Sequence, residues 1–245
     1  MSDRYAHAAA GIEEVADEAQ SRLRTVPGER RARLLASLRD DMVTEYDARF
    51  LVDYLDRMDQ SLCGPFREML ARWYDDEVRH FESFRCIVET CSGDATADLD
   101  ARRPDFAGVA HLFGGEFEIL CLLAYDELAT LRGYRGNLPM YAALGDRLGA
   151  FVRRVIGDEA GHYAGFRALL AERHAGRLGE VEEVVRRIRA TEGTPYHATF
   201  VLDHDDPVYG EHIFDEAARV LVSQMQRERD RRPCSPARPT PAASD

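Results

Sequence analysis

Residues 65–91 read PFREMLARWYDDEVRHFESFRCIVETC, with apolar side chains recurring in alternating steps of four and three residues. That spacing predicts one long helix with a single stripe facing the protein core. Glu77 and His80 stand in this stripe where apolar side chains are expected. The full stripe is Phe66, Leu70, Trp73, Glu77, His80, Phe84, Ile87 and Cys91. The helix therefore turns a carboxylate and an imidazole towards the core.

A second Glu-x-x-His interrupts a second stripe, further along the chain, at Glu159 and His162. The remaining stripe members there are apolar: Leu148, Val152, Val155, Phe166 and Leu169. Burying an unpaired carboxylate is costly, so each glutamate needs a partner. Neither stripe contains an arginine. A divalent metal ion would supply the counter-charge.

The spacing of two further glutamates sharpens this interpretation. Glu45 lies 32 residues before Glu77, and Glu127 lies 32 residues before Glu159, so one pattern occurs twice with an offset of 82 residues. One Glu from each of two helices, with Glu-x-x-His from each of two others, is the ligand set of di-iron helical bundles. The candidate catalytic and metal-ligating residues are thus Glu45, Glu77, His80, Glu127, Glu159 and His162.

Strand signals are nearly absent, and the periodicity predicts helices throughout. We expect an all-α fold, an antiparallel four-helix bundle with extra N- and C-terminal helices, in a single domain over 1–230. The bundle core covers about 29–174, and the proline-rich 231–245 is expected to be a disordered tail. The expected helices are 3–24, 29–60, 65–91, 106–132, 139–174, 180–191 and 209–228.

The choice of ligand on the expected helix 106–132 depends on where that helix ends. Two glycines and a proline in Gly133–Pro139 predict a break, which would leave Glu127 close to the turn. Either this segment is extended, so that Glu127 still lies level with Glu159, or the ligand is Glu116, which lies on the same stripe. The repeat spacing favours Glu127, with Glu116 as the alternative.

Composition excludes several function classes. The net charge is −12 and all 32 basic residues are arginine, which argues against a non-specific grip on nucleic acid or anionic lipid and rules out lysine chemistry. No run of eighteen apolar residues is present, so we expect no membrane span. The first residues lack the features of a secretion signal, and the five cysteines form no Cys-x-x-Cys, so we expect a cytoplasmic protein.

The strings Asp75–His80 (DDEVRH) and Gly157–His162 (GDEAGH) resemble the Asp-Glu-x-x-His signature of the ferritin-like di-iron carboxylate superfamily, in its oxygenase branch. The resemblance covers roughly residues 29–174. It implies that Asp76 and Asp158 each support a ligand histidine through the ring N–H. The chain departs from the arylamine N-oxygenases, which carry a third histidine where this sequence has Val155 and Ile156.

The resemblance implies two Fe ions, or an Fe/Mn pair, with O2 as co-substrate. The expected function is a di-iron oxygenase or oxidase, such as a monooxygenase, acting on a small organic molecule, for instance in secondary metabolism. The reaction would be hydroxylation, desaturation, N-oxygenation or oxidative C–C cleavage. A separate ferredoxin or reductase would supply electrons, because no flavin, Rossmann or cysteine-cluster motif is present.

Two alternatives stay open at this point. The first is a ferroxidase or iron-storage protein, because the 32-residue spacing also resembles bacterioferritin-type centres. The second is a bundle that keeps the ligands for structure only. The oligomeric state is open as well, with a homodimer among the options.

Overall fold

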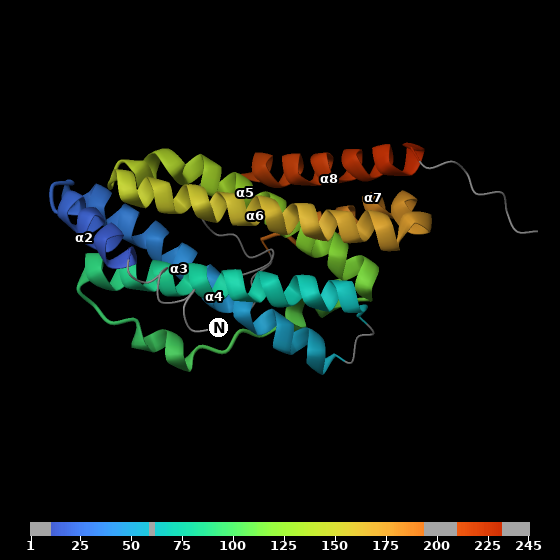
Figure 1. Ribbon diagram of the computed structural model, residues 1–245, viewed down its shortest axis with the longest axis horizontal. Helices are drawn as coiled ribbons and strands as arrows, with labels where there is room; N and C mark the ends of the chain where they lie inside the picture. The colour runs from blue at the N-terminus through green and yellow to red at the C-terminus, as the bar shows by residue number, and fades with distance from the viewer. Residues whose placement is uncertain (1–10, 59–61, 194–209, 232–245) are drawn as a thin grey trace, which may run out of the picture.

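The computed structural model describes residues 11–58, 62–193 and 210–231, and all regular structure in these ranges is helical (Figure 1). The all-α prediction is confirmed for this part of the chain. The elements are α2 (Ile12–Leu23), α3 (Gly28–Arg57), α4 (Gly64–Ser92), η1 (Ala97–Ala101), η2 (Phe106–Leu112), α5 (Glu116–Ala142), α6 (Asp146–Arg173), η3 (Ala175–Glu180), α7 (Val181–Thr191) and α8 (Glu211–Arg231).

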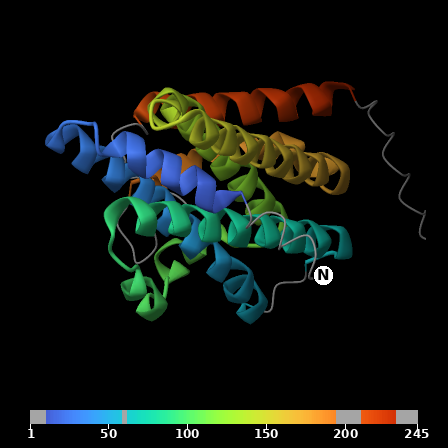
Figure 2. The same cartoon turned by 60° about the vertical axis from the view of Figure 1, so that its left-hand side comes forward.

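The four long helices form two pairs, α3 with α4 and α5 with α6, and α4 also contacts α6 (Figure 1). Helix α2 packs against α4 and α6 at one end of the molecule. Helices α7 and α8 pack against α5, and α8 runs along the outside of the α5–α6 pair in both views (Figure 2). This arrangement leaves a buried layer between the two pairs, where their inward stripes meet.

Local sequence explains how α4 and α6 are delimited. Pro65 occupies the first turn of α4, where its missing N–H costs nothing. The helix ends at Gly93, whose φ of 79° lies in the left-handed region, and its N–H bonds the Glu89 carbonyl at 2.9 Å. Gly145, with φ 143°, reverses the chain from α5 into α6. A side chain at Gly145 would also meet Glu18.

The predicted break at Gly133–Pro139 is wrong, because α5 continues through it to Ala142. Glycine in a helix interior costs up to about 1 kcal/mol and proline about 3 kcal/mol. Burial of Tyr134 and Tyr141 on this stretch offsets that cost, since both side chains are at most 2% exposed. The fourth and fifth expected helices are therefore misplaced at their boundaries: 106–112 is a separate 3-10 helix, and α6 begins at Asp146.

The other expected boundaries differ by a few residues. The second helix ends at Arg57, and the polar connection 92–105 contains η1. The last helix runs to Arg231, three residues further than expected. The start of the first expected helix, at 3–10, and the tail from 232 onward lie outside the described residues.

Buried apolar side chains form two clusters that adjoin along the long helices. One contains Trp73, Phe66 and Leu120, and the other contains Met42, Phe84 and Val152. In α4 and α6 the Glu-x-x-His motif lies between buried residues of the two clusters, whereas Glu127 on α5 lies among residues of the first. Among the described residues no single helix is long and apolar enough to cross a membrane; only η2 with α5, bent by 116°, would reach that length as a pair.

Candidate metal centre

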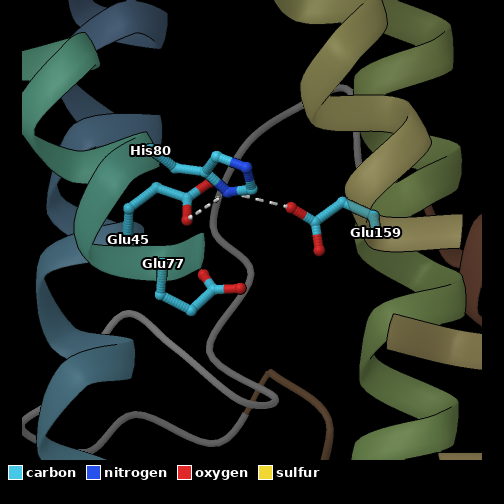
Figure 3. Close-up of side chains that lie close together, drawn as sticks. All are labelled: Glu45, Glu77, His80 and Glu159. Carbon is cyan, nitrogen blue, oxygen red and sulfur yellow. Dashed lines mark ion pairs between the residues drawn. The ribbon is translucent and has the colours of Figure 1, made fainter. Parts of the chain in front are cut away.

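Six acidic and imidazole side chains meet in the layer between the two helix pairs, and Figure 3 shows four of them, Glu45, Glu77, His80 and Glu159. Each of the four long helices contributes at least one of them, and none is more than 4% exposed. They are the six residues expected from the sequence: Glu45 on α3, Glu77 and His80 on α4, Glu127 on α5, and Glu159 and His162 on α6.

These side chains form two overlapping groups, each able to offer ligand atoms that all lie within 4.8 Å of one another. The first group adds Glu45 and His80 to a shared pair of glutamates, and the second adds Glu127 and His162 to the same pair. The shared pair is Glu77 and Glu159, one from each Glu-x-x-His. Two ions held this way would each have three carboxylates and one imidazole within reach.

Several of these buried polar atoms have no hydrogen-bond partner. Buried polar groups in folded proteins are nearly always bonded, so an unpartnered set requires an explanation. Within the cluster these atoms are Glu45 Oε2, Glu77 Oε1, His80 Nδ1, Glu127 Oε2 and Glu159 Oε1. In Figure 3, Glu45, His80 and Glu159 turn their polar ends towards one another. Donor atoms that converge without partners fit a bound cation.

Each ligand histidine is oriented by an aspartate from the opposite helix pair. His80 Nε2 lies 3.1 Å from Asp158 Oδ2, and His162 Nε2 lies 3.0 Å from Asp76 Oδ2. If Nε2 carries the ring N–H and donates it to the aspartate, Nδ1 faces the carboxylates, where it could bind a metal ion. Asp76 and Asp158 thus each contact a histidine of the cluster, and both contacts cross between α4 and α6.

Arg79 connects the two aspartates on the outer side of the cluster. Its Nη2 lies 2.7 Å from Asp76 Oδ1 and 3.2 Å from Asp158 Oδ2. Burial opposes ionisation of both carboxyls, but their bonds to the histidines and to Arg79 hold the pKa of Asp76 and of Asp158 below the usual range. Both aspartates therefore stay charged and keep accepting from the histidines.

Without a cation the inner cluster is electrostatically strained. Burial and the neighbouring charges of Glu45 and Glu159 raise the pKa of Glu77. Burial and Glu159 likewise raise the pKa of Glu127. Although burial disfavours charged imidazoles, the adjacent carboxylates raise the pKa of both His80 and His162. Protons kept on these glutamates and histidines reduce the repulsion between the carboxylates. A divalent ion would take the place of those protons.

Glu127, and not Glu116, lies in the cluster. Helix α5 continues for fifteen residues beyond Glu127 and α6 begins thirteen residues before Glu159, so the two glutamates sit at matching heights. Glu116 accepts the backbone N–H of Cys63 at 2.6 Å and lies 3.2 Å from Arg173 Nε. It joins the start of α5 to the start of α4, away from the six.

Two aromatic residues contact the cluster in ways that the sequence did not reveal. Trp73 Nε1 donates to Glu127 Oε1 at 2.6 Å, and the Tyr134 hydroxyl donates to Glu45 Oε1. Trp73 stands four residues before Glu77 on the α4 stripe, which is the one signal that could have marked it. Tyr134 carried none, because it lies in the segment expected to be broken.

The donor set limits the choice of metal. Four carboxylates favour hard ions such as Mn, imidazole suits Fe among others, and the combination fits Fe or Mn better than Cu or Zn. No protein-family model, curated protein or solved structure matches the chain. The buried cluster could hold a metal ion in each of its two groups, with Glu77 and Glu159 common to both.

Proposed function

We propose that the chain is a ferritin-like di-iron carboxylate protein that activates O2 to oxidise a small organic substrate. The observation that carries the proposal is the pair of overlapping ligand groups that share Glu77 and Glu159. Two separate metal sites would not need common ligands. Carboxylates that reach both positions keep two ions close together, as a two-electron reaction with O2 requires.

The chain's own residues would divide the work as follows. Glu45 and His80 would hold one ion and Glu127 and His162 the other, and Glu77 and Glu159 could ligate either. When bound, a pair of ferrous ions, or an Fe/Mn pair, supplies the electrons that reduce O2. Asp158 and Asp76 hold the ligand histidines in one tautomer. The apolar clusters on either side bury the six side chains and would limit the access of water to them.

A cavity beside the centre supports the proposal that the substrate is a small molecule. It has a volume of about 540 Å³, in the range of ligand pockets, and reaches the outer edge of the centre at His80 and Asp158. Its walls mix apolar and cationic side chains, namely Ile12, Phe151, Val155, Arg79 and Arg154. Helix α2, which is additional to the four long helices, contributes to this wall.

The alternative function is a ferroxidase that stores iron. A storage protein would assemble into a large cage, whereas an oxygenase would turn over a substrate. We propose a free-standing enzyme served by an external ferredoxin or reductase. The test is anaerobic loading with Fe(II), then rapid mixing with O2 while absorbance and O2 consumption are followed. Glu82→Gln serves as control, because Glu82 lies on α4 but is exposed.

The proposal expects about two irons per chain, a transient visible absorbance and O2 consumption that exceeds the iron present when an electron donor and substrate are added. A large cage that accumulates ferric mineral would replace it with the ferroxidase function. Less than one iron per chain, with no reaction with O2, would indicate a structural bundle.

A further inference from the structure

We propose that Trp73 and Tyr134 are positioning residues that hold the two unshared carboxylates, Glu127 and Glu45, to metal ligation through one oxygen each. The inference rests on the proposed metal centre and adds a statement about its ligation. In each of these carboxylates, Oε1 accepts a hydrogen bond from the protein and Oε2 would bind the ion.

The Trp73–Glu127 contact joins α4 to α5 inside the protein. The Trp73 side chain is fully buried, and its indole N–H donates to Glu127 Oε1 at 2.6 Å. The other oxygen, Oε2, has no hydrogen-bond partner and lies 3.4 Å from His162 Nδ1. One oxygen of Glu127 is thus occupied by the protein while the other faces the second ligand group.

The Tyr134–Glu45 contact repeats this division on the other side of the centre. The Tyr134 hydroxyl donates to Glu45 Oε1, and its ring stacks on Phe84 with centroids 6.1 Å apart and planes 8° apart. Glu45 Oε2 has no hydrogen-bond partner and lies 3.5 Å from His80 Nδ1. The stacking fixes the phenol ring, so its hydroxyl is aimed before any ion arrives.

The two donors are not products of the internal repeat. Shifted by 82 residues, Trp73 corresponds to Val155 and Tyr134 corresponds to Val52, neither of which can donate from its side chain. An indole and a phenol thus reach the same result from unrelated positions. Packing alone would not explain why each donor bonds a glutamate that belongs to one ligand group only: Glu127 for Trp73 and Glu45 for Tyr134.

The physical reason is the cost of an unmade hydrogen bond. If Glu127 or Glu45 turned to bind an ion through both oxygens, it would weaken its hydrogen bond to a buried donor. One-oxygen ligation keeps that bond. Each ion would then take one oxygen fewer from these carboxylates, which would favour an open position for O2.

The test uses Co(II) as probe, because its visible absorption weakens as its coordination number rises. Trp73→Phe and Tyr134→Phe are compared with Tyr141→Phe, a control on α5 whose buried hydroxyl donates to Asp41, outside both ligand groups. We expect wild type and the control to bind two Co(II) with equal absorbance. Each test variant should bind two Co(II) with lower absorbance per ion, because the released carboxylate takes up both oxygens.

Unchanged spectra in both test variants at full loading would overturn the positioning role while leaving the metal centre intact. Failure of the wild type to bind two Co(II) would overturn the centre, and this inference with it. A second measurement needs no variant, because Trp73 is the only tryptophan. Its indole N–H proton should resonate downfield and stay there after Zn(II) loading. An upfield shift on loading would contradict the proposal.

Discussion

The α3–α4 pair and the α5–α6 pair present the same ligands in the same order but hold them in different surroundings. Each pair supplies a glutamate and, 32 residues later, a Glu-x-x-His. Between the two residues of that motif in α4 stands Arg79, which reaches both supporting aspartates, whereas the equivalent position in α6 is Gly161. The positions that would touch an ion are the same in both halves.

On the proposed metal centre, the difference separates the residues that an ion would require from those that packing determines. Ligand identity follows from the donor chemistry, so it repeats. The surroundings follow from what each helix pair packs against, since α2 lies on α4 and α6 whereas α7 and α8 lie on α5. Support therefore crosses between halves: α6 orients the α4 histidine, and α4 orients the α6 histidine.

The largest expected effect comes from the residues that the two halves share. Glu77→Gln or Glu159→Gln should remove a ligand from both groups at once and lower the affinity for both ions by more than about 100-fold, beyond the effect of losing a supporting residue. Metal analysis after gel filtration would show close to zero ions per chain, against about two for Glu82→Gln. Retention of one ion would mean that the groups are independent.

A smaller effect is expected at the crossing aspartates. Asp158→Asn should weaken the ion bound by His80, and Asp76→Asn the ion bound by His162, each by about 10- to 100-fold. Competition with a metal-binding dye would resolve the two affinities. Equal weakening of both ions in each variant would contradict the crossed assignment.

Arg79 sharpens this comparison because it serves both aspartates. Arg79→Gln should weaken both ions alike, by only a few-fold, since partly exposed ion pairs contribute about 0–1 kcal/mol. An effect on one ion alone would show that Arg79 belongs to one half of the centre.

The smallest effect is a pH dependence of the empty protein. The raised pKa of Glu77 and Glu127 means that the folded state holds protons that the unfolded chain has released above about pH 4.3. The histidines act in the same direction, since their stabilisation is present below their ordinary pKa near 6.5 and is lost as pH rises through the raised folded pKa. Chelated protein should therefore lose thermal stability between about pH 5 and 8.

Metal-loaded protein should behave in the opposite way, because ions bind the deprotonated ligands. The gap in melting temperature between loaded and chelated samples should widen as pH rises. Glu77→Gln, which cannot take up the proton, should show a shallower pH slope when chelated. Parallel curves for loaded and chelated wild type would contradict this account.

The sequence predicted what depends on local pattern. The α4 and α6 stripes could be recognised because a charged residue in an apolar period is visible within a few turns. The course of α5 could not be predicted, because burial of Tyr134 and Tyr141 outweighs the local cost of Gly133, Gly136 and Pro139. The roles of Trp73 and Tyr134 depend on contacts between helices, which no spacing within one helix encodes.

The central claim is that one buried cluster holds two ions with shared ligands. Crystals loaded with Mn(II) would test it directly through anomalous difference maps. The account predicts two peaks, one among Glu45, Glu77, His80 and Glu159 and one among Glu77, Glu127, Glu159 and His162. A single peak, or peaks away from these six side chains, would contradict it.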